Sequence, residues 1–235
     1  MSLKNWDNKT WLSSTSYIKS FNKFLIKENK LNKNSEILDI GCGRGKILGN
    51  LTSKLRLANK PIGIDIEQHK DRDKRIIFNK TDAISYLKKN RKKFDLILLK
   101  QTIHFLPLKD IKKLLLLCMN YLNSGGRIAI FTLATSKNEI PTFLKMKKKL
   151  NKSLKRDERI LRYINSLYPG SILKTFSFKV KISREKYLEM IENRYISTLL
   201  NLSNAEILKG ISEINRNYRQ RLNFKDKLIC LILKK

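Results

Sequence analysis

Three glycines alternate with a cysteine and an arginine in the segment Gly41-Cys42-Gly43-Arg44-Gly45. A strand-forming run at residues 36–40 comes immediately before them and carries Asp39. A periodic segment follows them and predicts a helix. Glycines at this density let the chain turn sharply at the end of a strand and let a ligand lie against bare main chain. The pattern therefore predicts a nucleotide-binding turn.

The spacing of the glycines separates two kinds of nucleotide-binding turn. The nicotinamide-dinucleotide fingerprint is G-x-G-x-x-G, in which the third glycine lies three positions after the second. Here the pattern is G-x-G-x-G, and Lys46 occupies the place of that third glycine. The turn therefore departs from the nicotinamide pattern.

Two apolar runs downstream of the turn each carry a carboxylate near their end. Asp65 lies in the run at residues 61–66, and Asp82 lies in the run at residues 75–83. A carboxylate at the end of the second strand of a βαβ unit accepts hydrogen bonds from both ribose hydroxyls. The order of these residues supports a nucleoside site.

Five segments in this order resemble the class I S-adenosylmethionine-dependent methyltransferases. The glycine turn resembles motif I of that family, and residues 94–106 resemble its fourth strand, whose end faces the transferable methyl. Residues 123–131 resemble its L-x-P-G-G-x-L strand entry, with Ser124 in place of the proline. The similarity covers residues 36–134, and several ordered motifs are more specific than any one alone.

The resemblance implies S-adenosylmethionine as cofactor and S-adenosylhomocysteine as its product. It also implies that Asp82 and Ala83 lie beside the adenine, where the carboxylate would accept from the exocyclic amine and the next backbone amide would donate to the ring. It places the cofactor against the glycine turn, the ends of the following strands and their neighbours: Asp39, Gly41, Cys42, Gly43, Gly45, Asp65, Ile66, Asp82, Ala83 and Lys100. Taken singly, these acidic residues have structural explanations of equal weight. Asp39 would brace the turn, Asp65 would be a solvated strand end, and Asp82 would cap a helix at residues 83–89.

Candidate residues for methyl transfer lie farther along the chain. His104 follows the fourth strand, and an imidazole that titrates near neutrality suits a general base; a packing or hydrogen-bonding role is the alternative. Residues 183–197 loosely resemble small-molecule methyltransferases related to trans-aconitate methyltransferase. There, Arg194 would clamp a substrate carboxylate and Tyr195 would shape the pocket. The alternative for Arg194 is an ordinary surface charge.

Alternating strands and helices must position these residues. The fold class that we expect is α/β, a Rossmann-like methyltransferase with a seven-stranded, mostly parallel sheet and an antiparallel last strand. We expect one domain: a helical lead-in at 1–34, a cofactor-binding core at 36–134, a helical cap at 135–172, and C-terminal strands and helices at 173–235. A helix is expected over 204–222 and the last strand over 228–233. In the lead-in, Trp6 and Trp11 belong to the apolar spacing, and Trp11 and Tyr17 are candidate lid residues or core residues.

Composition narrows the class of protein. The chain has 235 residues and 41% hydrophobic composition, which suffices for one domain with a full core. No run reaches the length of a membrane span, and no apolar signal core is present at the start. We therefore expect a cytoplasmic protein with no membrane partner. The three cysteines show neither metal-ligand spacing nor a disulfide framework, so no metal is expected.

The net charge of +31 has two explanations. A strong basic excess attracts polyanions such as RNA. However, lysine dominates over arginine, and the lysines are spread along the chain, as a bias toward AT-rich codons would produce. The function that we expect is methyl transfer to a small molecule, with a carboxylate or hydroxyl acceptor favoured. The alternatives are an RNA methyltransferase that uses the basic surface and a cofactor-binding module without catalysis. The oligomeric state stays open.

Overall fold

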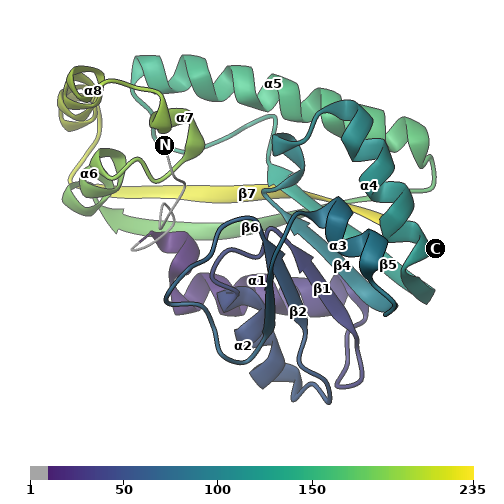
Figure 1. Cartoon of the computed structure of the whole chain (residues 1–235). Helices are drawn as coiled ribbons and strands as arrows, with labels where there is room; N and C mark the ends of the chain where they lie inside the picture. Colours follow the sequence, from purple (N-terminus) through teal and green to yellow (C-terminus); the bar gives the residue numbers. More distant parts are fainter. Residues whose placement is uncertain (1–9) are drawn as a thin grey trace.

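The computed structural model describes residues 10–235, and its centre is a seven-stranded sheet (Figure 1). The strands lie in the order β3-β2-β1-β4-β5-β7-β6. Strands β1 to β5 pair in parallel, whereas β7 is antiparallel to both β5 and β6. Their bounds are β1 Ile37–Ile40, β2 Ile62–Asp65, β3 Ile77–Lys80, β4 Phe94–Lys100, β5 Leu122–Leu133, β6 Ile172–Ser183 and β7 Arg221–Lys234. The fold class expected from the sequence is confirmed.

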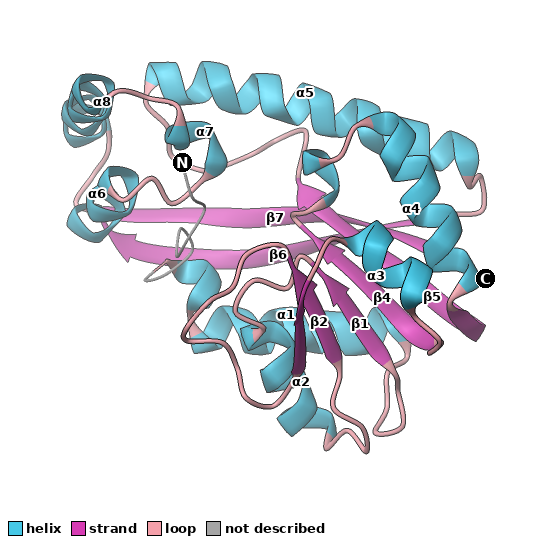
Figure 2. Ribbon diagram, in the orientation of Figure 1, coloured by secondary structure: helices cyan, strands magenta, loops and turns pink. Residues whose placement is uncertain are grey.

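Helices cover both faces of this sheet (Figure 2). One face is packed by α1 and α2, and the other by α3, α4 and part of α5. Helices α6, α7 and α8 connect β6 to β7 and lie at the far end of that hairpin. The helices are η1 Trp11–Ser13, α1 Thr15–Asn29, α2 Lys46–Leu55, α3 Ala83–Lys89, η2 Ile103–Phe105, α4 Leu108–Asn120, α5 Leu144–Leu167, α6 Arg184–Glu192, α7 Ser197–Leu200 and α8 Asn204–Asn217.

The central strands are apolar on both faces because helices cover both. All four residues of β1 are buried, and five of the seven residues of β4 are buried. Residues of β4 divide between the two apolar clusters: Leu96 and Leu98 join the α1–α2 side, and Ile97 and Leu99 join the α4 side. This arrangement brings the carboxyl ends of the parallel strands to one edge, where ligands bind in open α/β sheets.

The β6–β7 hairpin is long. Its pairing runs from Ile172 opposite Ile232 to Ser183 opposite Arg221. The helix expected over 204–222 is wrong at its C-terminal end: α8 stops at Asn217, and β7 begins at Arg221 instead of residue 228. Side chains alternate between buried and exposed from Leu222 onward, and that period of two belongs to a strand.

The N-terminal segment leads onto the sheet. Ser14 caps α1 by accepting from the backbone amide of Tyr17, and the helix buries Tyr17 and Phe21 completely. Trp11, in η1, is also buried. Trp6 lies outside the described residues. The lead-in therefore packs its aromatic residues against the sheet, where Phe21 contacts Phe131 of β5 and Phe176 of β6.

Candidate active site

The glycine turn connects β1 to α2 and needs glycine for two different reasons. Gly41, Gly43 and Gly45 all have positive φ angles, of 76°, 54° and 68°, which side chains rarely tolerate. A Cβ on Gly41 would lie 2.3 Å from the Oγ1 of Thr102, so this position is closed. A Cβ on Gly43 would meet nothing within 4 Å in the described part of the chain. The open side of the turn is therefore at Gly43.

Asp65, at the end of β2, reaches the same turn. Its Oδ2 accepts from the backbone amide of Gly43 at 2.8 Å, and its Oδ1 accepts from Glu67 at 2.9 Å. Cys42 is half-buried, and its Sγ packs against Gly63 of β2. Ile66, the residue after Asp65, is 64% exposed. The structure thus brings the predicted glycine and acidic residues together at one edge of the sheet.

Asp39 lies near the C-terminal end of β1, and Lys100 is the last residue of the neighbouring strand β4. Asp39 is 3% exposed, and its Oδ1 has no hydrogen-bond partner among residues 10–235. Burial raises the pKa of Asp39 to about 7; the positive charge of Lys100 opposes this rise, and the negative charge of Asp65 adds to it. The Lys100 ammonium lies 5.5 Å from the ring centre of Tyr17 and 5.6 Å from that of Phe21. A buried, unpartnered carboxylate oxygen beside the bare turn fits a cationic ligand.

Asp82 caps helix α3. Its side chain accepts from the backbone amide of Ser85 at 2.9 Å, and this hydrogen bond lowers the pKa of Asp82 below its usual range. Ala83 is the first residue of the helix. The capping explanation for Asp82 is therefore present in the structure, and it leaves the proposed contact with adenine open.

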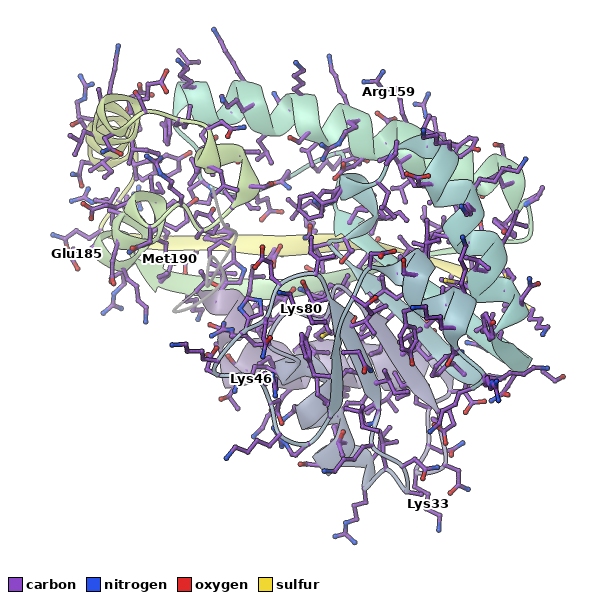
Figure 3. The ribbon with its side chains drawn as sticks, viewed as in Figure 1. Lys33, Lys46, Lys80, Arg159, Glu185 and Met190 are labelled. Carbon is purple, nitrogen blue, oxygen red and sulfur yellow. The ribbon has the colours of Figure 1, made fainter. Side chains whose placement is uncertain are left out.

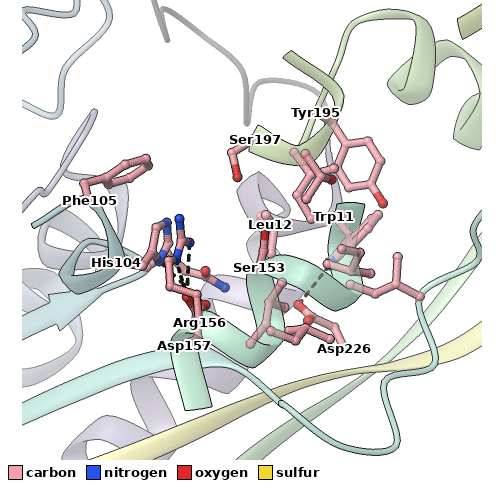
Figure 4. A pocket seen from close by; sticks show the side chains of 17 residues that line it. Trp11, Leu12, His104, Phe105, Ser153, Arg156, Asp157, Tyr195, Ser197 and Asp226 are labelled. Carbon is pink, nitrogen blue, oxygen red and sulfur yellow. Dashed lines mark hydrogen bonds and ion pairs between the residues drawn. The ribbon is translucent and has the colours of Figure 1, made fainter. Parts of the chain in front are cut away.

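A pocket lies beside the end of β4, under α5 (Figure 4). It is narrow, with a cavity volume of about 50 Å³. Its walls come from η1, the loop after β4 with η2, the end of β5, the segment before α5 and α5 itself, the start of α7 with the residues before it, and β7. The polar side chains of the lining are Gln101, His104, Ser153, Arg156, Asp157, Tyr195, Ser197, Thr198 and Asp226; the rest is apolar and includes Trp11, Leu12, Phe105 and Leu154.

His104, Arg156 and Asp157 form one polar side of this pocket (Figure 4). The Nδ1 of His104 lies 3.9 Å from Asp157, whose other carboxylate oxygen accepts from Arg156 at 3.1 and 3.2 Å. Burial, with a smaller effect of Arg156, lowers the pKa of His104 to about 4. Burial raises the pKa of Asp157. The imidazole is therefore neutral at physiological pH and stands as a weak base.

Trp11, Tyr195 and Asp226 form the opposite side (Figure 4). The Trp11 indole donates to Asp226 at 3.0 Å. The Tyr195 ring lines the pocket, while its hydroxyl hydrogen-bonds to that of Tyr187 at 2.9 Å. Asp226 is absent from the sequence-based candidates. The signal for it was the alternation of β7, in which Asp226 shares the buried phase of Phe224 and Leu228.

Arg194 does not line this pocket, although it directly precedes the lining residue Tyr195. Its guanidinium donates to the Leu199 carbonyl at 3.2 Å and to Asn204 at 2.7 Å, so it ties together the loop around α7. Its φ angle is 53°. These contacts give Arg194 a local structural role next to Tyr195.

In residues 10–235, no three or more His, Cys, Asp or Glu side chains are grouped as metal ligands would be. None of the helices in this part of the chain has the length and apolar character to cross a membrane.

Comparisons with known proteins agree with this geometry. The model of a family described as a methyltransferase domain matches residues 31–194. The plantazolicin methyltransferase BpumL, solved with a monoazolic desmethylPZN analog and S-adenosylhomocysteine, is 19% identical, with 98% of this chain and 88% of that chain covered and a TM-score of 0.55. A Thiobacillus denitrificans methyltransferase solved with S-adenosylhomocysteine is 14% identical, with coverages of 98% and 97% and a TM-score of 0.58. No curated protein matches by sequence.

The chain belongs to this methyltransferase family. Its fold is that of the class I methyltransferases, the class that uses S-adenosylmethionine as methyl donor. The solved structures share its fold at low sequence identity, so their ligands do not identify the substrate of this chain.

Proposed function

We propose that this protein binds S-adenosylmethionine at the glycine turn and transfers its methyl group to a small molecule in the pocket under α5. The observation that carries this proposal is that the end of β4 lies beside both the glycine turn and the pocket. Lys100 acts electrostatically on Asp39 beside the turn, and the next residue, Gln101, lines the pocket. A cofactor at the turn and an acceptor in the pocket would thus be neighbours.

The residues around the turn fit the cofactor. Asp39 offers an unpartnered carboxylate oxygen, as judged over residues 10–235, and Gly43 offers bare main chain. Asp65, Ile66, Asp82 and Ala83 would hold the nucleoside, as the family resemblance implies. When bound, the cofactor supplies an electrophilic methyl group.

The protein's own part in the reaction is chiefly positioning and exclusion of water. Methyl transfer is an in-line displacement, in which correct orientation of the two reactants supplies much of the rate enhancement. Trp11, Leu12 and Phe105 give the pocket apolar walls. His104 is neutral and would accept a proton only weakly.

The lining suggests which acceptors fit. A carboxylate or a hydroxyl was favoured from the sequence, but the buried carboxylate of Asp226 faces this pocket and would repel a carboxylate. A hydroxyl or an amine on a compact apolar body fits better. The narrow volume favours a small molecule over a polymer.

RNA methylation stays the second candidate because of the net charge of +31. Basic side chains project from opposite sides of the molecule, as Lys33 and Arg159 show in Figure 3. A charge spread in this way specifies attraction without a defined binding groove.

Calorimetry with S-adenosylhomocysteine tests the cofactor site. Gly43→Ala should fold yet bind the nucleoside at least about tenfold more weakly, because the new methyl would fill the open side of the turn. Gly125→Ala is the matched control: Gly125 also has a positive φ, of 72°, and a Cβ there would likewise meet nothing within 4 Å in the described chain. Equal affinities of the two variants would contradict this placement.

A methyl-release assay across metabolite pools separates an enzyme from a binding module. We expect S-adenosylhomocysteine to accumulate with at least one pool. Tight nucleoside binding without release in any pool would support the module that has lost catalysis.

A further inference from the structure

The pocket contains a carboxylate whose hydrogen bonds are incomplete. Asp226 is 1% exposed on β7, opposite Phe178 of β6. Its Oδ2 accepts from the Trp11 indole, whereas its Oδ1 has no hydrogen-bond partner within residues 10–235. A buried acceptor that has lost water and gained no partner is costly, so such groups in native proteins point to a missing ligand or a functional role.

Asp226 shares the electrostatic effect of Lys100 with a second buried carboxylate, because Lys100 acts on both Asp226 and Asp39. Burial raises the pKa of Asp226, whereas the hydrogen bond from Trp11, the charge of Lys100 and hydrogen bonding with Tyr17 lower it. When both carboxylates are ionised, they share the positive charge of Lys100 among the described residues. Buried charges are costly unless they are paired, so this region favours a cationic or strongly donating ligand.

The other pocket carboxylate is different. Asp157 already accepts two hydrogen bonds from Arg156 and lies beside His104. Its charge is therefore compensated by a neighbour on the same helix. Of the two pocket carboxylates, Asp226 is the one with a fully buried acceptor atom that lacks a hydrogen-bond partner among the described residues.

The phenol of Tyr17 is the nearest internal competitor. Burial raises the pKa of Tyr17 well above its usual value, and the charge of Asp226 and hydrogen bonding between the two side chains add to this rise, although the buried hydroxyl makes no hydrogen bond of ordinary geometry within residues 10–235. A small movement would let Tyr17 donate to Asp226 and satisfy both groups. That contact would leave Asp226 without need of a ligand, and the experiment below distinguishes the two cases.

We infer that Asp226 binds an amine group of the methyl acceptor, so the acceptor is a small amine with an apolar body. This inference rests on the proposed function and names the substrate class of the same pocket. The amine donates to Oδ1, the Trp11 indole holds Oδ2 in place, and the apolar walls receive the remainder of the molecule.

Three probes that differ in one group test this inference: benzylamine, benzyl alcohol and benzoate. Their dissociation constants are measured by ligand-observed NMR with the full chain saturated by S-adenosylhomocysteine. We expect benzylamine to bind about tenfold or more tightly than benzyl alcohol, since a charge-assisted hydrogen bond is stronger than a neutral one. Benzoate should bind most weakly.

Asp226→Asn keeps the side-chain shape and a carbonyl oxygen for Trp11, but it replaces the free acceptor by an amide donor. In this variant the preference for benzylamine should fall to within about twofold. Glu158→Gln removes a charge from the neighbouring part of α5, outside the pocket lining, and should keep the preference.

Calorimetry with S-adenosylhomocysteine on each variant separates the two levels of failure. If the parent chain does not bind S-adenosylhomocysteine, the proposed function itself is wrong. Normal nucleoside binding without a benzylamine preference, or a preference that survives in Asp226→Asn, would overturn the role of Asp226 alone.

Discussion

At the scale of the residue, burial sets the protonation of the site. Asp39 and His104 are both deprived of water, and in both cases burial is the largest cause of the pKa shift. The shifts have opposite directions because burial favours the neutral form of each group. The site therefore has a weakened acid beside the glycine turn and a weakened base in the pocket.

Replacement of Asp39 by asparagine should change how stability depends on pH. The pKa of Asp39 rises from 3.8 in the unfolded chain to about 7 in the folded one. Only the folded state keeps this proton between those values, so its stabilising effect is present below pH 4 and is lost as pH rises to about 7. Relative to the parent, Asp39→Asn should gain up to about 4 kcal/mol between pH 4 and 8. Urea unfolding at both pH values measures this, and a constant difference would contradict it.

Replacement of His104 by alanine tests the base role. An imidazole with a pKa of about 4 accepts protons poorly near neutrality. We therefore expect His104→Ala to keep its S-adenosylhomocysteine affinity and most of its turnover, measured as nucleoside release. A fall in kcat of about a hundredfold or more, with unchanged affinity, would instead support a general base.

Residues were predictable from the sequence where their signal is local. The glycine turn, Asp65 and Asp82 lie within or beside short apolar runs, so their spacing and the family resemblance singled them out. Asp226 stands between Lys225 and Lys227, and a charged triplet reads as solvent-exposed. Only its pairing within the hairpin shows that Asp226 lies on the buried face.

At the scale of the element, the strands whose ends meet at the glycine turn could be predicted from the sequence. The buried run of β4 and the turn after β1 follow from composition and glycine spacing. The start of β7 was missed because a helical and a strand pattern overlap near residue 218, where the Tyr218 backbone is already extended. Short overlaps of this kind are decided by tertiary pairing instead of local preference.

Two substitutions at the cap of α3 separate its structural role from ligand binding. Asp82→Ala removes the acceptor for the Ser85 amide and should cost about 1 kcal/mol of stability. Asp82→Ser keeps a capping oxygen and should restore that stability, but it lacks the carboxylate. If the carboxylate also holds adenine, both variants bind S-adenosylhomocysteine more weakly. Normal affinity of Asp82→Ser would leave Asp82 as a cap only.

At the scale of the whole molecule, charge and shape point to different partners. The net charge of +31 attracts any polyanion, whereas the narrow pocket under α5 suits the small acceptor that we propose. Electrostatic attraction of this kind weakens as salt displaces the released counterions. Salt dependence therefore separates the two functions.

RNA should bind this protein only at low salt. Between 50 and 200 mM salt we expect the affinity for a single-stranded RNA to fall by about a thousandfold, as contacts to several phosphates would produce. Nucleoside release in the presence of RNA should stay at its background rate. An RNA that remains bound at 200 mM salt and becomes methylated would contradict the small-molecule proposal.

The hydrogen bond from Trp11 to Asp226 joins residues 215 positions apart. The cofactor turn, in contrast, is complete once the chain has folded through β4. During synthesis, the two halves of the site are therefore finished at different times, and the acceptor wall must wait for β7. Closure of so long a loop is also slow in refolding. In a refolding experiment, nucleoside binding should recover before the tryptophan fluorescence that reports this last contact.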